Sequence, residues 1–189
     1  GEAASRLRVR TDATVVRDIA AEIEWAKVSQ VTPEAYAVRS RASARGGVGD
    51  LDPEVVARVY AGYEAVKRDR GVIDFEDVLL LAAGMIEDDA AMAAAVRSQY
   101  RCLLVDEYQD VSPIQQRLLD LWLADSDDLT VVGDANQTIY SFAGATPTYL
   151  LDFRRRFPRA EVVRLQRSYR STPQVVSTAN RLLASAPGA

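Results

Sequence analysis

The sequence has 189 residues with 23 basic and 27 acidic side chains, a net charge of −4, one cysteine and no histidine. Without histidine, and with Cys102 as the only thiol, the chain lacks the residues for a Ser-His or Cys-His catalytic couple, a zinc cluster or an internal disulfide. A hydrophobic fraction of 48% is typical of a globular protein with a real core, so any catalysis must depend on carboxylates, hydroxyls, arginines or backbone groups.

The basic residues are almost all arginines, because only Lys27 and Lys67 are lysines. A phosphate-binding loop of the GxxxxGK[ST] kind needs a lysine directly after a glycine, and these two follow Ala26 and Val66. The sequence therefore contains no Walker A loop. No apolar run approaches the roughly 20 residues of a membrane-spanning helix, and no secretory signal is visible. We expect a cytoplasmic protein with no membrane partner.

The first half of the sequence is predicted to be helical. Apolar residues recur at helical spacing over residues 12–28, with Asp12 as the N-cap. Proline at the first helical position predicts further helices from Pro33 and Pro53, separated by a glycine-rich loop over residues 43–50. The remaining helices of this half are predicted at residues 75–86, behind Asp74 as a cap, and at residues 90–97.

After residue 100 the pattern changes from helices alone to alternating strands and helices. Three short apolar runs, at residues 102–107, 129–134 and 161–165, are typical of parallel strands buried on both faces. Ser112 and Gln115 form a capping-box pattern that predicts a helix over residues 113–124, and another helix is expected from Pro173. This order predicts an α/β fold, in which ligands bind at the carboxyl ends of the strands.

Two acidic residues, Asp106 and Glu107, end the first apolar run. This is the pattern of a Walker B element, in which one carboxylate holds Mg²⁺ and the next orients or deprotonates the attacking water. Taken alone, the pattern is common and equally describes a solvated strand end. Two longer strings follow it in order: VVGDANQTIYSFAGA at residues 131–145 and LQRSYRST at residues 165–172. Together with DEYQD at residues 106–110, they resemble motifs II, III and IV of superfamily 1 DNA helicases of the UvrD, Rep and PcrA type, in a form closest to actinobacterial UvrD-like proteins.

The resemblance implies a domain organisation. Residues 1–73 would form a helical 1B-like subdomain, and residues 74–165 would form the second half of the RecA-like domain 1A, with its parallel sheet and motifs II and III. Residues 166–189 would carry motif IV and begin domain 2A. We expect an internal fragment, with the Walker A segment before residue 1 and the later motifs after residue 189.

The resemblance also implies roles in using ATP and Mg²⁺. Asp106 would bind the metal ion, and Glu107 would be the catalytic base for hydrolysis. Gln137 resembles the motif III glutamine that contacts the γ-phosphate, and its amide can donate and accept hydrogen bonds at once. Arg170 resembles the arginine that reaches the same phosphate from the second domain. Tyr169 resembles the residue that stacks on adenine.

Tyr140 and Phe142 correspond to the motif III aromatics on which bases of single-stranded DNA stack. Stacking tolerates any base, as a translocating motor requires. In place of the usual Tyr-Gly-Trp-Arg-Gly this sequence has Ala143 at the arginine position, which removes one contact to DNA. The alternative is that both rings are core aromatics and that Gln137 only caps a turn. The expected partners are single-stranded DNA and junctions of single- and double-stranded DNA.

The parent protein is thus expected to be an ATP-dependent 3′-to-5′ DNA helicase or translocase of DNA repair or replication. Two alternatives remain: the helicase part of a helicase–nuclease of the AddA or RecB kind, and a non-catalytic DNA-binding relic. Without a Walker A loop, the 189 residues alone are expected to be inactive. The acids Asp74, Glu76 and Asp77 are explained as helix-start residues favoured by the helix dipole.

Overall fold

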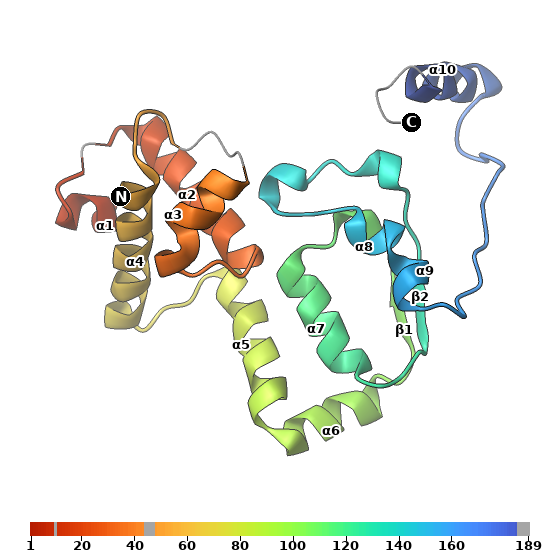
Figure 1. The fold of residues 1–189 in the computed structure, drawn as a ribbon, viewed down its shortest axis with the longest axis horizontal. Helices are drawn as coiled ribbons and strands as arrows, with labels where there is room; N and C mark the ends of the chain where they lie inside the picture. Colours follow the sequence, from red (N-terminus) through yellow and green to blue (C-terminus); the bar gives the residue numbers. More distant parts are fainter. Residues whose placement is uncertain (10, 44–47, 185–189) are drawn as a thin grey trace. The chain divides into compact units, whose positions relative to one another are not determined.

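The computed structural model describes residues 1–9, 11–43 and 48–184 (Figure 1). Four residues of the predicted glycine-rich loop, 44–47, lie outside the described residues. The chain divides into two compact units, Gly1–Leu150 and Leu151–Ala189, and each is described by itself. Within the described parts of the chain, no helix is both long and apolar enough to cross a membrane.

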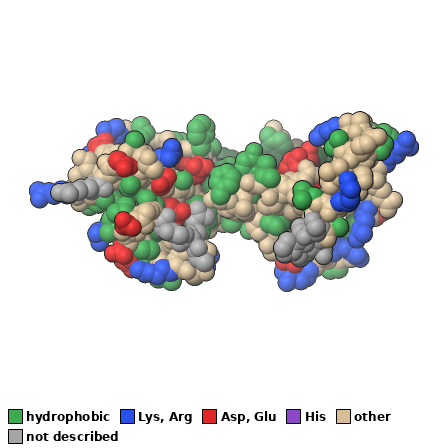
Figure 2. Space-filling view, turned by 90° about the horizontal axis from the view of Figure 1, so that it is seen from above, with side chains coloured by type: hydrophobic (Ala, Val, Ile, Leu, Met, Phe, Trp, Pro, Cys, Tyr) green, Lys and Arg blue, Asp and Glu red, His purple; other side chains and the backbone are tan. Residues whose placement is uncertain are grey.

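The first part of unit 1 is a group of helices around an apolar core. These helices are α1 (Glu2–Arg6), α2 (Ala13–Val28), α3 (Pro33–Ala42) and α4 (Pro53–Arg70) (Figure 1). The Asp12 carboxylate accepts a hydrogen bond from the Val15 amide at 2.8 Å, which confirms the predicted cap. Trp25 and Tyr36 meet edge to face in the core, with ring centroids 6.4 Å apart. Acidic and basic side chains are interspersed over this part of the surface (Figure 2).

Three further helices of unit 1 pack around a second apolar cluster that includes Ala83, Ile86 and Ile114. They are α5 (Phe75–Asp88), α6 (Ala90–Gln99) and α7 (Pro113–Leu123). The predicted starts of α5 and α7 are confirmed by hydrogen bonds at their caps. The Asp77 amide donates to Asp74 at 2.9 Å, and the Ser112 amide donates to Gln115 Oε1 at 2.8 Å.

Two short strands, β1 (Leu103–Val105) and β2 (Leu129–Val131), pair in parallel, with Leu103 opposite Leu129. The parallel pairing confirms the sequence prediction, but the prediction that both faces are buried is wrong. Leu104 is 72% exposed, because alternate side chains point to opposite faces and one face of this two-stranded sheet is open. Short helical turns and a helix follow the strands: η1 (Tyr108–Asp110), η2 (Ala135–Gln137), η3 (Ser141–Ala143) and α8 (Thr148–Leu151).

Unit 2 contains the helices α9 (Phe153–Arg156) and α10 (Pro173–Ala184), the second of which begins at the predicted proline. The strand predicted at residues 161–165 is wrong, because this segment has no strand hydrogen bonds. Val163 is 75% and Leu165 88% exposed. Apolar composition favours a strand only where a neighbouring strand can pair with it, and none of the described residues does so here.

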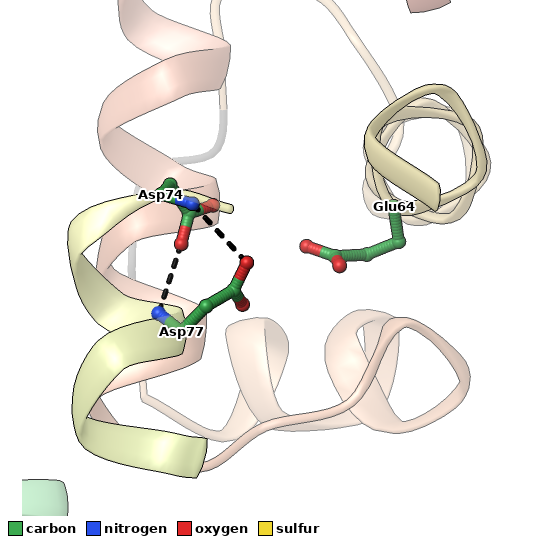
Figure 3. A group of neighbouring side chains, drawn as sticks. All are labelled: Glu64, Asp74 and Asp77. Atoms are coloured by element: carbon green, nitrogen blue, oxygen red, sulfur yellow. Dashed lines mark hydrogen bonds between the residues drawn. The ribbon is translucent and has the colours of Figure 1, made fainter. Parts of the chain in front are cut away.

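The two lysines of the chain meet in one ion-pair cluster, which we call the lysine cluster: Lys27, Glu64, Lys67, Asp74 and Asp77. Lys27 Nζ from α2 lies 2.5 Å from Asp74 Oδ1 and 2.5 Å from Asp77 Oδ1. Lys67 Nζ from α4 lies 2.8 Å from Asp74 Oδ2 and 3.0 Å from Glu64 Oε1. The acids come from α4 and from the start of α5, and they face one another (Figure 3). The cluster therefore joins α2, α4 and α5.

We predict that Lys27→Met strongly destabilises the protein. The lysine side chain is only 2% exposed, so its loss leaves the partly buried carboxylates of Asp74 and Asp77 with Lys67 as their one remaining lysine partner. Breaking a buried ion pair in this way costs roughly 3–5 kcal/mol, which urea unfolding would measure as a lower free energy of unfolding. Arg41→Met is the matched control, because its pair with Glu54 lies on the surface and should matter much less. Equal losses in the two variants would contradict the prediction.

We also predict that acid weakens the fold through this cluster. Burial raises the pKa of Asp74, but hydrogen bonds from Lys27 and Lys67 outweigh it and hold the pKa well below its usual range. Burial also raises the pKa of Asp77, and hydrogen bonds from the same two lysines outweigh it, so this pKa is lowered as well. A carboxyl with a depressed folded pKa stabilises the protein above its unfolded pKa, so this contribution is lost as the pH falls below about 4. Urea unfolding at a series of pH values should show this loss, and Asp77→Asn should reduce it. A free energy of unfolding that stays constant down to about pH 3 would contradict this.

Candidate functional site

The carboxyl ends of β1 and β2 bring acidic residues from two segments to one edge of the sheet. Asp106 and Glu107 directly follow β1, and Asp134 follows β2 after two residues. The pairing continues past the strands, because the Val132 amide donates to the Val105 carbonyl at 2.8 Å and the Tyr108 amide donates to the Val132 carbonyl at 2.9 Å. The edge therefore holds carboxylates from both segments.

Glu107 has an unusual backbone conformation for a residue with a side chain. Its φ of 52° and ψ of 41° lie in the left-handed region, and it precedes η1. Such a conformation has an energetic cost and persists only where the surroundings hold it. The Glu107 amide donates to Asp106 Oδ1 at 2.9 Å, and both side chains are exposed. The first two acids of the segment thus face solvent at the strand end.

Gln109 connects the two segments beneath these exposed acids. Its side chain is 1% exposed, and its Nε2 donates to Glu107 Oε2 at 2.7 Å and to Asp110 Oδ2 at 3.2 Å. Its Oε1 accepts from the Asp134 amide at 3.0 Å. A Cβ at Gly133 would lie 2.7 Å from this oxygen, so the close approach requires glycine.

Gln137 lies in η2 with its side chain on Asp134. Gln137 Nε2 donates to Asp134 Oδ2 at 2.9 Å, and the Asn136 amide donates to Asp134 Oδ1 at 3.0 Å. These two bonds, the side-chain bond first, lower the pKa of Asp134, because both stabilise the ionised form. Asp134 thus caps the turn, and Gln137 is exposed and bonded to this capping carboxylate.

Tyr140 and Phe142 are surface aromatics. They are 52% and 69% exposed, and their ring centroids lie 6.2 Å apart. The alternative that they are core aromatics is therefore wrong. Their loop is also tied to the first segment, because the Ile139 amide donates to Asp110 Oδ1 at 3.3 Å and the Thr146 amide donates to the Val111 carbonyl at 3.3 Å.

The loop that carries these rings rests on the end of α2. Gly144, directly after η3, has a φ of 94°, which glycine adopts readily. A Cβ there would lie 2.7 Å from Val28 Cγ2 and 3.2 Å from Ser29 Oγ. Packing against α2 therefore sets the position of η3.

Tyr169 and Arg170 belong to unit 2, and both are exposed. The Arg167 guanidinium lies 5.2 Å from the centroid of the Tyr169 ring, in a cation–π contact. In unit 1, hydrogen bonds through Gln109 and Asp134 connect Glu107 with Gln137, whereas Tyr169 and Arg170 lie in unit 2.

Outside this edge, three carboxylates have the spacing of a metal site, but their partners are two lysines. Glu64, Asp74 and Asp77 lie close enough to share an ion (Figure 3). However, Lys27 and Lys67 fill the space between them, so they form an ion-pair cluster. From the sequence these acids are explained only as helix-start residues, and the cluster was not predicted. The signal was the presence of just two lysines among 23 basic residues. The connecting role of Gln109 was not predicted either, and its position in DEYQD was the signal for it in the sequence.

Comparison with known proteins identifies a family. The sequence model described as "UvrD/REP helicase N-terminal domain" matches residues 3–158. The chain is 59% identical to the ATP-dependent DNA helicase UvrD2 of Mycobacterium tuberculosis, over 98% of this chain and 27% of that protein. It is 34% identical to the ATP-dependent DNA helicase Rep of Escherichia coli, over 77% of this chain and 21% of that protein. The chain therefore spans about a quarter of the length of its mycobacterial relatives.

We predict that Gly144→Ala destabilises the protein by about 1–3 kcal/mol, because the new methyl group would meet Val28 and the positive φ would be strained. Urea unfolding measures the change. Gly84→Ala is the control: this glycine lies within α5 with nothing near its Cβ position, so alanine should be neutral or stabilising by up to about 1 kcal/mol. An equally tolerated Gly144→Ala would show that η3 does not depend on α2.

Proposed function

The chain belongs to the UvrD/REP helicase family, and from that premise we propose that it is part of an ATP-dependent DNA helicase that translocates 3′ to 5′ in DNA repair or replication. The observation that carries the proposal is the sheet edge with Asp106 and Glu107 after β1, where hydrogen bonds through Gln109 connect Glu107 with Asp134 and its partner Gln137. An exposed pair of carboxylates at the ends of parallel strands is the arrangement that nucleotide hydrolysis uses.

We propose that residues 74–165 are the second half of a RecA-like domain 1A, preceded by a 1B-like helical part over residues 1–73 and followed by the start of domain 2A. The parallel β1–β2 pair, with α7 between the strands in sequence, supports the first assignment. The separate helical core of α1 to α4 supports the second.

Asp106 has the properties of a Mg²⁺ ligand for an enzyme that uses ATP. Mg²⁺ is usually held by one or two carboxylates together with substrate phosphates and water. Asp106 is exposed, and the hydrogen bond from the Glu107 amide is at Oδ1, which leaves Oδ2 for a metal ion. When bound, the ion would supply positive charge that stabilises the phosphates.

Glu107 and Gln137 would act on water and on the γ-phosphate. Glu107 is exposed, and Gln109 donates to its Oε2, which leaves Oε1 to accept a proton from an attacking water. Gln137 can turn its amide from Asp134 toward a phosphate oxygen, because that bond lies at the surface. Arg170 would add a fixed positive charge on the same phosphate, and Tyr169 would stack on adenine. Since the 189 residues contain no Walker A sequence, we expect no ATPase activity from them alone.

Tyr140 and Phe142 would form the surface on which bases of single-stranded DNA stack. Two neighbouring exposed rings offer π faces to successive bases, and such stacking needs no specific base sequence. Junctions of single- and double-stranded DNA would be the natural substrates of such an enzyme.

The DNA contact is tested by Tyr140→Ala and Phe142→Ala, with fluorescence anisotropy of a labelled oligothymidylate as the measurement. Each substitution should weaken binding by about tenfold, because stacking contributes roughly 1–3 kcal/mol per base. Both side chains are exposed, so the far-UV circular dichroism should stay unchanged. Phe75→Ala is the control, since this ring is 88% exposed on α5 and should not affect binding. Unchanged affinity in both folded variants would contradict the proposed stacking surface.

A further inference from the structure

We propose that Gln109 is a positioning residue that holds the Glu107 carboxylate and the turn containing Asp134 in one fixed arrangement. The inference rests on the proposed function, in which Glu107 is the catalytic base. Gln109 itself is buried and would act through the Glu107 carboxylate, to which its amide donates.

The hydrogen bonds of Gln109 define the direction of its amide. Carboxylates only accept hydrogen bonds, so the amide nitrogen must face Glu107 and Asp110, and both of its N–H groups are used. The amide oxygen then faces the backbone amide of Asp134. Neither a glutamate nor an apolar residue can make all three bonds, so glutamine is required by chemistry as well as by size.

Burial makes this arrangement rigid. The Gln109 side chain is 1% exposed, whereas the Glu107 side chain that it binds is exposed. An exposed glutamate otherwise samples several rotamers, and a bond to a buried, fully bonded amide limits them. Correct placement of a catalytic carboxylate before substrate arrives is a recognised source of rate enhancement.

The same support extends to the loop that carries the aromatic rings. The backbone at Gly133 can approach Gln109 because glycine has no Cβ; a Cβ there would lie 2.7 Å from Gln109 Oε1 and 3.1 Å from Leu150 Cδ2. Asp110, bonded to Gln109, also accepts from the Ile139 amide next to Tyr140. The proposed catalytic base and the proposed DNA contact are therefore both connected to the buried Gln109, the second of them through Asp110.

The test uses the 189-residue chain labelled with ¹³C and ¹⁵N, without ATP or DNA, and two readouts by nuclear magnetic resonance. These are the hydrogen exchange rate of the Asp134 amide and the ¹³Cδ chemical shift of Glu107. In Gln109→Leu, exchange at Asp134 should be about fivefold faster, because one hydrogen bond is lost, and the Glu107 signal should move. In Gln109→Glu, the acceptor for Asp134 remains but the donor to Glu107 is lost, so only the Glu107 signal should move.

Gln116→Leu is the matched control for loss of a buried glutamine. Gln116 is 4% exposed, accepts from the Tyr108 hydroxyl at 2.7 Å and donates to Asp120 at 2.6 Å. Its side-chain hydrogen bonds go to Tyr108 and Asp120 and not to Glu107 or Asp134, so this variant should change neither readout while lowering thermal stability comparably. If Gln109 only stabilised the fold, Gln109→Leu and Gln116→Leu would have the same effect on the Asp134 exchange rate and on the Glu107 chemical shift.

The proposal is overturned if Glu107 and Asp134 are unchanged in folded Gln109→Leu, or if Gln116→Leu changes them equally. If Gln109→Leu does not fold, Gln109→Glu decides, and an unmoved Glu107 signal overturns the proposal. Adding oligothymidylate to the same samples tests the proposed DNA contact separately. Failure to bind would count against that contact, while the Gln109 measurements, made without DNA, would stand.

Discussion

The interaction on which the structure depends is the burial of two lysines among three carboxylates. Removing such charges from water costs several kcal/mol for each ion, and the cost is offset only when nearly every carboxylate oxygen is bound. Lys27 and Lys67 meet this condition by joining Glu64, Asp74 and Asp77. The cluster fixes the end of α2 against α5, and the next residue of α2, Val28, supports Gly144 after η3. The position of the surface aromatics thus depends on an ion-pair cluster outside the site.

The candidate site has a similar arrangement, in which an exposed carboxylate is held by a buried polar side chain. Asp106, Glu107 and Gln137 face solvent, where phosphates and water can reach them. Gln109 lies beneath them and connects the ends of the two strands. A site for a charged substrate must leave its acids accessible, so its precision has to come from residues under the surface.

Much of the local structure could be predicted from the sequence. The caps at Asp12, Asp74 and Ser112 and the parallel pairing of β1 with β2 were predicted and are present. The strand predicted at residues 161–165 is absent, and Leu104 is exposed rather than buried. Both errors have one cause: apolar runs show that a segment can be a buried strand, but pairing and burial depend on neighbours that a local pattern does not contain.

The sequence by itself determined the helix starts, the acidic strand ends and the motif strings, because each depends on residues within a few positions of one another. Only the tertiary structure decided which distant groups meet. Lys27 binds Asp74 across 47 positions, and Gln109 binds Asp134 across 25. Contacts at such separation form only when the chain folds back on itself, and their energy comes from burial and matched hydrogen bonds. The lysine cluster and the role of Gln109 therefore emerged from the fold, although every residue involved was visible in the sequence.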